Sequence, residues 1–546
     1  MRMGVVGSRR AQKWLASLLF SSVTAIIGNC AAYAAAVTAP VSDSLASARF
    51  VLQRVEVRQS TVLTPQDIAE INQRWRGKLV SGYELLVIAR ELTERYTEQG
   101  YSGSGVVLAD QEIERGNVVF TAREVKVSNV VLATSPRWMW PTAVKNLVWP
   151  WRDHILHLPT LQDRITMTRD SPHLKRVDAD LAVGVPDAAS ATLTLNVEEA
   201  SPMQAWITSA NNRNPSIGAV RSEVGVSHRS LLGWGDQAEY RVGRTEGLDD
   251  KTWNYSFPIP RTNITLSASR GRVDSKAIEP RVFRDLDIVA LSNSDSRGLT
   301  WTAFRTPTQS ASFGFVSDRR RSSTSLLGLP FSFTLGLPDG ESEVRVKRVT
   351  AEYVYRDANR NASVRIIGSR GTVSPTIDQD IPGAVNPHYR LAQLGATFVQ
   401  RFGEGASLPI EVRFRLDGQF SAETLAPVER LSFGGSNSVR GYRENLFLRD
   451  RGAILRSELG VETIELGSWL KLSPSLFVDT GWGRDVQPRE DGTPRSISSA
   501  GLNLETRVGP YFRVGATWAH GFKRAFANGG NLQDRGVHLT ATVSYP

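Results

Sequence analysis

Two charged residues in the last quarter of the chain have the types and the neighbours to form a buried ion pair. Arg440 lies in a glycine-rich stretch, Phe433–Tyr442, and Asp479 lies in a segment that ends in Phe477–Gly481. The planar guanidinium of arginine can bind a carboxylate through two parallel hydrogen bonds. Three glycines beside Arg440 permit a tightly folded backbone: Gly434, Gly435 and Gly441. These residues predict structural ion pairing, which requires elements that bring two distant segments together.

No catalytic or metal-binding motif accompanies this pair. The sequence has no Gly-x-Ser-x-Gly elbow, no Walker loop and no His-Glu-x-x-His motif. His154, His157 and His173 lack metal-ligand spacing, and the only cysteine is Cys30. Four tryptophans could line a substrate groove or, as we favour, pack in a small domain: Trp138, Trp140, Trp149 and Trp151. We therefore expect no cofactor, no bound metal and no enzymatic activity.

The segments around the pair alternate in polarity. From about residue 204 to the C-terminus, short segments with every second residue apolar are separated by Gly, Asn, Asp and Pro. Clear examples are Ile410–Leu416, Leu502–Val508, Phe512–Trp518 and Val537–Tyr545. Segments of about ten residues with one apolar and one polar face are typical of a transmembrane β-barrel. A soluble β-sandwich or a β-solenoid would also alternate, but a sandwich rarely extends over about 340 residues as one domain.

The connections between these segments alternate between short and long. The short ones are Arg401–Ser407, Thr463–Ser468 and Pro510–Tyr511, and the long ones are Gln419–Gly452, Thr480–Ser499 and Gly521–Arg535. Short periplasmic turns and long outer loops give this asymmetry in outer-membrane barrels. About 21 residues per strand and connector predict sixteen antiparallel strands, although the middle holds nearer eighteen candidate segments. For residues 285–345 the pattern does not predict which residues of neighbouring strands lie opposite one another.

Alternation also fixes the side of the barrel wall on which Asp479 lies. Phe477, Asp479 and Gly481 share one face of their strand. The opposite face is largely apolar and suits lipid: Leu472, Pro474, Leu476 and Val478. Asp479 therefore faces the lumen, where an isolated carboxylate is costly unless it has a partner. A long loop that folds back into the lumen would place Arg440 on Asp479 and let Tyr442 pack against the wall.

The preceding region, Phe50 to about Pro202, mixes strands and helices in an order that occurs twice. In the first copy, residues 50–125, Thr64 and Pro65 begin a helix, and a second helix ends at Gly100. The other elements expected there are strands Phe50–Val57, Val106–Leu108 and Val118–Phe120. The second copy, residues 126–202, is expected to contain strands Val125–Leu132, Val177–Val183 and Ala191–Val197 and a helix Leu161–Thr168. We predict two α+β domains of about 75 residues each, followed by an all-β barrel over residues 203–546.

The N-terminus and the charge pattern indicate an exported protein. Residues Met1–Ala36 have a charged start, an apolar stretch and a small-residue cleavage site at Ala32–Ala34, as a secretory signal peptide does. Residues 37–49 form a short segment that contains Pro40. The apolar stretch is shorter than the roughly 20 residues of a membrane helix. The formal net charge is +10, but basic and acidic residues alternate along the chain, so we expect no nucleic-acid partner.

Several motifs, in order along the chain, resemble one family of transporters. They are Gly100-Tyr101, Gln111–Gly116, Leu231–Asp236, which looks like an early barrel turn, Tyr255–Pro260, which looks like the next strand, Phe433–Tyr442 and Phe477–Gly481. Together they resemble the TpsB transporters of two-partner secretion, the ShlB/FhaC/HecB haemolysin secretion/activation branch of the superfamily that includes BamA. The resemblance covers nearly all of the chain after the signal peptide.

The resemblance implies a bacterial outer-membrane protein with two periplasmic POTRA domains and a sixteen-stranded barrel among membrane lipids. Its function would be ATP-independent export of a secreted TpsA-like exoprotein, such as a haemolysin, an adhesin or a haem-binding protein. The POTRA domains would bind this partner by adding its strand to a sheet edge. A lumen-loop motif (Val439, Arg440, Gly441, Tyr442) would dock on a barrel-wall motif (Phe477, Asp479, Gly481). We expect the protein to act as a monomer.

Two other functions fit parts of the pattern. A factor of the BamA or TamA kind, which inserts other barrels, generally carries more POTRA units than the two that fit here. A passive solute porin has no need for a periplasmic segment of about 150 residues. Some members of the family plug the pore with a long N-terminal helix, for which the segment 37–49 is short.

Overall fold

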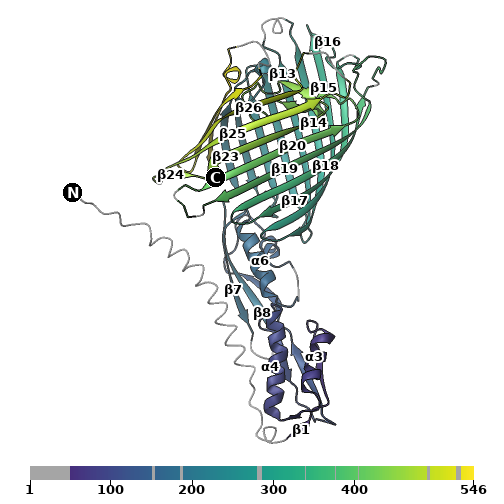
Figure 1. Ribbon diagram of the computed structural model, residues 1–546, viewed down its shortest axis with the longest axis vertical. Helices are drawn as coiled ribbons and strands as arrows, with labels where there is room; N and C mark the ends of the chain where they lie inside the picture. Colours follow the sequence, from purple (N-terminus) through teal and green to yellow (C-terminus); the bar gives the residue numbers. More distant parts are fainter. Residues whose placement is uncertain are drawn as a thin grey trace, which may run out of the picture. The chain divides into compact units, whose positions relative to one another are not determined.

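The computed structural model describes residues 49–545 except 151–153, 185–188, 280–285, 339, 376, 404, 407, 488–491 and 524–529. The expected signal peptide and nearly all of the segment 37–49 lie outside the described residues. The chain divides into two compact units, residues 1–200 and 201–546, which are drawn in Figure 1. Within the described ranges, no helix is long and apolar enough to cross a membrane.

The first half of the N-terminal unit is a small sheet packed against two helices. Its elements are β1 (Phe50–Val51), β2 (Arg54–Arg58), α3 (Pro65–Trp75), β3 (Leu79–Val80), α4 (Gly82–Glu98), β4 (Gly105–Leu108) and β5 (Asn117–Arg123). The main sheet has the order β2-β5-β4, with β2 parallel and β4 antiparallel to β5. Both helices begin with a capping box, Thr64 with Asp67 and Ser81 with Glu84.

The expected single strand Phe50–Val57 is wrong, because the chain changes partner within it. β1 pairs with β3, whereas β2 pairs with β5. Between them the Leu52 amide donates to the Lys78 carbonyl at 3.0 Å, and the Gln53 amide donates to the Gly116 carbonyl at 2.8 Å. The Leu52 side chain is fully buried in the core. Alternation of polarity does not report such a change of partner.

The second half of the N-terminal unit repeats the plan with one more helix than expected. Its elements are β6 (Lys126–Leu132), α5 (Pro141–Val148), α6 (Leu158–Arg169), β7 (Leu174–Val183) and β8 (Ser190–Glu199), with sheet order β6-β8-β7. The unexpected helix α5 begins at a proline and lies within the tryptophan-rich stretch. Trp149 is buried, as packing requires, but Trp138 and Trp140 are 40% and 56% exposed. Trp151 lies outside the described residues.

In the described part of the second unit, sixteen long antiparallel strands close into a barrel, which confirms the predicted fold class. They are β9 (Met203–Ala210), β10 (Arg221–Arg229), β11 (Gln237–Arg244), β12 (Leu248–Pro258), β13 (Ile264–Lys276), β14 (Val289–Arg305), β15 (Gln309–Leu326), β17 (Glu341–Arg356), β18 (Arg360–Ser374), β19 (His388–Phe402), β20 (Ile410–Ser421), β23 (Arg451–Val461), β25 (Leu470–Arg484), β26 (Ser496–Val508), β27 (Phe512–Gly521) and β28 (Val537–Tyr545). Two short strands extend hairpins: β16 (Leu329–Pro330) and β24 (Ile464–Leu466).

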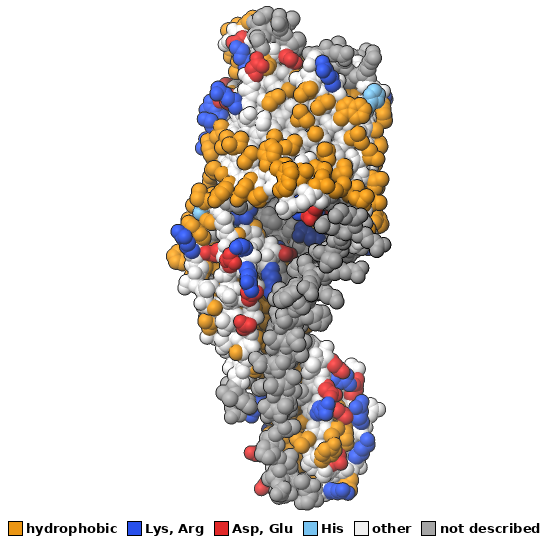
Figure 2. Space-filling view, turned by 90° about the vertical axis from the view of Figure 1, so that its left-hand side faces the viewer, with side chains coloured by type: hydrophobic (Ala, Val, Ile, Leu, Met, Phe, Trp, Pro, Cys, Tyr) orange, Lys and Arg blue, Asp and Glu red, His pale blue; other side chains and the backbone are white. Residues whose placement is uncertain are grey.

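The outward face of the barrel carries an apolar band, and the inward face is largely polar. Within the band, alternate residues of the strands are exposed and apolar, for example Ile207, Trp253, Val349 and Leu476, which are 42–60% exposed. Figure 2 shows hydrophobic side chains as a band across the barrel. Such a band is what the hydrocarbon layer of a membrane covers. We call the end of the barrel at which β9 starts the entry end, and the opposite end the far end.

The strands reach further toward the far end than the sequence indicated. β20 continues to Ser421 and β25 to Arg484, so the expected loops starting at 419 and 480 are shorter. The third long connection holds a short 3-10 helix, η3 (Leu532–Arg535). The register that the sequence left open is continuous between β15 and β17, from Gln309 opposite Tyr355 to Ser323 opposite Glu341.

Candidate functional site

The connection between β20 and β23, residues 422–450, folds back into the barrel, and we call it the lumen loop. It contains a hairpin of β21 (Leu431–Phe433) and β22 (Phe447–Arg449). Its Leu425 and Ala426 pack with inward-facing residues of β17 and β19, including Val346 and Tyr389. Other residues of the loop pack with Ile454 and Ile497 of β23 and β26: Phe433, Val439, Tyr442 and Phe447. The loop therefore lies inside the barrel and follows its inner wall from β17 to β26.

Arg440 of the lumen loop and Asp479 of β25 form a two-pronged ion pair. Arg440 Nε donates to Asp479 Oδ2 at 2.7 Å, and Nη2 donates to Oδ1 at 2.8 Å. The Arg440 backbone amide also donates to Oδ2, at 3.1 Å. The Arg440 residue is 4% exposed and Asp479 is 0% exposed. The guanidinium carbon lies 3.4 Å from the centre of the Phe477 ring, a cation-π contact.

Two further charges complete this arrangement, and we call the set of four the charge cluster: Arg440, Arg456, Glu458 and Asp479. Arg440 Nη1 donates to Glu458 Oε2 at 3.2 Å, and Arg456 Nε lies 4.0 Å from Asp479 Oδ1. Arg456 and Glu458 are on β23, where they lie opposite Asp479 and Phe477 of β25. Two cations therefore face two anions, and the cluster is neutral as a whole. Buried charges are tolerated only when paired in this way.

Small residues on the inward wall make a groove for the loop. A side chain at Gly481 would place its Cβ 2.8 Å from Phe433 Cδ1 and 3.0 Å from Val439 Cγ2. One at Gly483 would lie 2.7 Å from the Phe433 ring. These distances are shorter than a normal contact between two carbon atoms. The loop can therefore pack against the wall here only because both wall residues are glycines.

The residues after Arg440 continue the contact across β26 and β27. Gly441 has φ +86°, and its α-hydrogens face Ala519 of β27, where a Cβ would be 2.9 Å away from the alanine Cβ. The Tyr442 hydroxyl donates to the Ser498 carbonyl at 2.9 Å and accepts from the Lys523 amide at 3.2 Å. All seven residues that the sequence singled out for the two motifs thus lie at one interface between loop and wall.

The lumen loop is also tied to the far end of the seam where β28 meets β9. The Glu444 amide donates to Gln533 Oε1 at 2.9 Å, and Gln533 Nε2 donates to the Asn211 carbonyl at 2.8 Å. Asn214 Nδ2 donates to the Glu444 carbonyl at 2.8 Å. Arg443 forms an ion pair with Asp534. Displacing the loop would therefore remove the hydrogen bonds that join it to the connections beside the first and last strands.

The turn Leu231–Asp236 at the entry end is organised by a buried carboxylate. Asp236 Oδ1 accepts from the Leu232 amide at 2.9 Å, and Oδ2 accepts from the Tyr255 hydroxyl at 3.1 Å. Tyr255–Pro260 was expected in the strand after this turn. It lies instead at the end of β12, one strand further, where the barrel register brings Tyr255 beside the turn.

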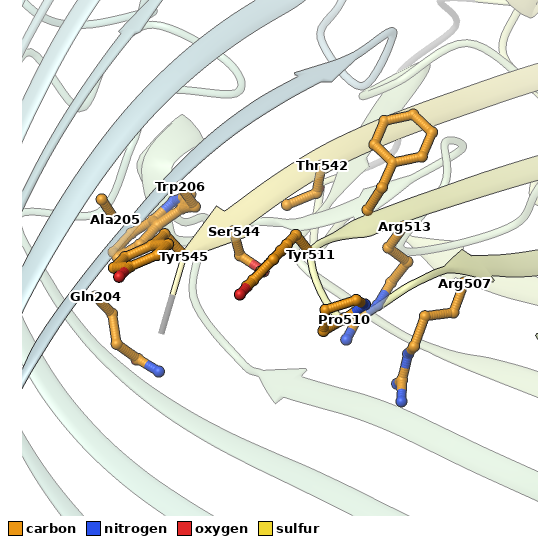
Figure 3. A pocket seen from close by; sticks show the side chains of 11 residues that line it. Gln204, Ala205, Trp206, Arg507, Pro510, Tyr511, Arg513, Thr542, Ser544 and Tyr545 are labelled. Carbon is orange, nitrogen blue, oxygen red and sulfur yellow. The ribbon is translucent and has the colours of Figure 1, made fainter. Parts of the chain in front are cut away.

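A cavity of about 420 Å³ lies at the entry end of the seam. Figure 3 shows its lining, which includes Trp206 of β9, Tyr545 of β28, and Arg507 and Arg513 of the next two strands. The rings of Tyr511 and Tyr545 stack with centres 6.0 Å apart. Aromatic side chains at this level form the girdle with which barrels meet the membrane interface.

In the N-terminal unit, side chains bind backbone groups of the strands where no neighbouring strand pairs with them. Asn72 donates to the Val55 carbonyl on β2 and accepts from the Val55 amide, at 3.0 and 2.7 Å. Gln111, which the sequence singled out, does the same for Val119 of β5, at 2.6 and 2.7 Å. On β7 the Val177 carbonyl accepts from Arg169 Nε at 3.0 Å.

The two halves of the N-terminal unit meet at residues that the sequence also singled out. A Cβ on Gly100, which has φ +85°, would lie 2.8 Å from His157 Nε2, so only glycine fits there. The Tyr101 and His157 rings lie 5.0 Å apart. Nearby, burial raises the pKa of the Tyr96 phenol, which stays protonated and donates to Glu124 at 3.0 Å.

Sequence reasoning missed Arg456, Glu458, Gly483 and Gln533. Their position beside the motifs depends on which strands are neighbours and in what register, and one sequence does not reveal that. Gly483 could have been found from the sequence, because it is two residues from Gly481 and therefore lies on the same face of the strand.

Comparisons with known proteins agree with this architecture. The family model for haemolysin secretion/activation protein ShlB/FhaC/HecB matches residues 190–507, and that for the ShlB-type POTRA domain matches residues 50–124. The chain is 22% identical over 488 residues to the heme/hemopexin transporter protein HuxB of Haemophilus influenzae, with 84% of this chain and 81% of that protein covered. It is 21% identical over 481 residues to the outer membrane transporter CdiB of Escherichia coli O6:K15:H31, covering 84% and 77%. The structure of CdiB from Escherichia coli has a TM-score of 0.69 at 16% identity and covers both chains fully.

Proposed function

The chain belongs to the ShlB/FhaC/HecB haemolysin secretion/activation family, whose members are outer-membrane transporters of two-partner secretion, and from this premise we propose how it handles its cargo. The entry end of the barrel is then the periplasmic end, and the far end faces the outside. We propose that an extended partner polypeptide is captured by strand addition in the N-terminal unit. It then passes through the lumen once the lumen loop has moved, without nucleotide hydrolysis.

The single observation that carries the proposal is the occupied lumen. The lumen loop lies inside the barrel against its inner wall and is held there by a buried ion pair between Arg440 and Asp479. A passive pore gains nothing from such an arrangement. A transporter that opens only for its cargo needs a closed resting state. The arriving polypeptide can take the place of the loop because both would contact the same inner wall of the barrel.

For the capture step we propose the free edge of β7. This strand has ten residues, more than any other edge strand in the described part of the N-terminal unit. The Val177 carbonyl faces away from β8, because Arg169 reaches it from outside. Since backbone groups alternate in direction along a strand, the amides of Ala179 and Leu181 face outward too, and those of the even-numbered residues face β8. Strand addition would use these outward groups.

This alternation allows a sharp test of capture. Ala179→Pro removes one outward amide and leaves the ladder with β8 intact, so we expect secretion of the partner exoprotein to fall while barrel assembly stays normal. Ala179→Ser is the matched control, since it keeps the amide. Secretion is measured in the culture medium against the amount of heat-modifiable barrel in the outer membrane. Normal secretion by Ala179→Pro would exclude β7 as the capture edge.

A further inference from the structure

One side of the barrel carries an unusual density of outward-facing cations between the apolar band and the outer rim. They lie on consecutive strands from β12 to β19 and share the outward face with exposed apolar residues such as Leu299, Phe315, Val349 and Ile366. Lys347, for example, is two residues before Val349 in β17, nearer the far end, and therefore points the same way. These side chains stand just above the level of the hydrocarbon layer.

The strand register arranges these charges in three continuous rows, which together we call the basic face. The first row is Arg297, Ser317, Lys347, Arg370 and Arg390, each opposite the next. The second is Arg270, Asp295, Arg319 and Arg345. The third is Lys251, Arg272, Asn293, Arg321 and Glu343. The rows contain four, three and three cations against two anions, Asp295 and Glu343.

Anions on and beside the basic face pair with its second and third rows, including Asp274, which lies 3.1 Å from Arg272, and leave the first row unpaired in the described part of the chain. Glu343 is contacted by three arginines, Arg319, Arg321 and Arg345. Among the described residues, the four cations of the first row have no ion-pair partner within 4.0 Å: Arg297, Lys347, Arg370 and Arg390. Like charges directly opposite one another across strands are destabilising. Lys347, Arg370 and Arg390 form such a run on three adjacent strands, so the fold alone gives no reason for it.

The opposite side of the barrel provides the contrast. From β20 through β28 and on to β11, the outward residues toward the outer rim are mostly apolar or small, for example Phe420, Leu455, Trp482 and Leu539. The described exceptions among arginines are Arg244, Arg451 and Arg484. A general need for charge at the outer rim would have placed cations evenly around the barrel.

We propose that the basic face binds the phosphorylated headgroup of a glycolipid in the outer leaflet of the membrane. The face is continuous with the lipid-covered band and lies at headgroup level, so a lipid seated on Val349 and Ile366 presents its headgroup to Lys347 and Arg370. Adjacent strands are about 4.8 Å apart, so the run of three cations extends over roughly 10 Å. That span fits a headgroup with more than one phosphate, and arginine binds phosphate oxygens with two hydrogen bonds. This inference rests on the outer-membrane location and not on the export mechanism.

The test uses the full-length mature protein in nanodiscs of phosphatidylcholine doped with bisphosphorylated lipid A. Native mass spectrometry of the released barrel gives an apparent dissociation constant for the lipid. The variant is Lys347→Gln/Arg370→Gln/Arg390→Gln. Its matched control removes three outward cations that lie off the basic face, Arg244→Gln/Arg360→Gln/Arg484→Gln. One cation near an anionic lipid is worth about fivefold in binding, so the variant is expected to bind on the order of 100-fold more weakly at low salt.

The proposal also predicts that dephosphorylated lipid A and phosphatidylglycerol bind far more weakly than bisphosphorylated lipid A. It is overturned if the triple variant binds like the wild type, if its control loses as much, or if either comparison lipid binds equally well. Heat-modifiable migration shows whether each barrel is folded. If the triple variant does not fold, lipid binding by the wild-type protein is measured at low and high salt instead. Binding that does not weaken at high salt would contradict a site formed by charges.

Discussion

Removing either partner of the Arg440–Asp479 pair should release the lumen loop. The pair is buried and two-pronged, and breaking a buried pair from one side typically costs about 3–5 kcal/mol. Each remaining charge keeps one neighbour: Arg440 keeps Glu458 at 3.2 Å, and Asp479 keeps Arg456 at 4.0 Å. We therefore expect the lower end of the range, about 3 kcal/mol. Since about 1.4 kcal/mol is a factor of ten, the released population should rise roughly 100-fold.

The neutrality of the charge cluster makes the double variant informative. Arg440→Ala leaves the cluster with a net charge of −1 and Asp479→Ala leaves it with +1. The double variant leaves Arg456 with Glu458 and no net charge, so it should release the loop no more than the worse single variant. Arg440→Lys should lie between wild type and Arg440→Ala, because an ammonium keeps the charge and loses the two-pronged geometry.

Release can be measured by labelling Val439→Cys with a membrane-impermeant maleimide added from outside. Val439 is fully buried against the wall, and the chain's own cysteine is Cys30 in the expected signal peptide. Leu532→Cys, at a position 43% exposed in an outer connection, is the control that should label at rest. The reasoning is refuted if both single variants label Val439→Cys at the wild-type rate in correctly folded barrels, or if the double variant shows the sum of the two effects.

Two further substitutions probe the same interface. Gly481→Ala should loosen the loop and raise single-channel conductance in planar bilayers, because its Cβ would lie 2.8 Å from Phe433; overpacking of this kind costs about 1–3 kcal/mol. Gly515→Ala is the control, with nothing nearer than 3.9 Å, and an equal rise in both would contradict the steric argument. Tyr442→Phe removes the hydrogen bond to the Ser498 carbonyl and should raise the loop-labelling rate about fivefold, for a loss of about 1 kcal/mol. An unchanged rate would assign the role of Tyr442 to its ring alone.

The barrel and the face on which Asp479 lies could be predicted because both depend on a period of two along the chain. Leu476 and Val478 are exposed and Phe477 and Asp479 are buried, as alternation requires. What alternation leaves open is the neighbour across each strand. Glu458 completes the charge cluster only because β23 lies opposite β25 in one register, and a shift by one residue would turn it to the other face.

Sequence signals within a few residues did not predict elements whose position depends on contacts with distant segments. Helix α5 begins after Trp140, whose side chain does not cap the helix, so its start lacks the polar signal that marks α3 and α4. The break at Leu52 likewise results from pairing with two different strands. Both features follow from contacts between segments far apart in the chain.

The closure of the barrel sets the order in which this chain can fold. β28 pairs with β9 from Thr540 opposite Ala210 to Tyr545 opposite Ala205, across some 340 residues of chain. Joining ends so distant costs about 5 kcal/mol in loop entropy, against about 1 kcal/mol for a short hairpin. Until that pairing forms, β9 and β28 each expose a row of unbonded amides and carbonyls, which the hydrocarbon layer does not tolerate. The chain therefore has to be synthesised and delivered complete before any part of the barrel is stable in the bilayer.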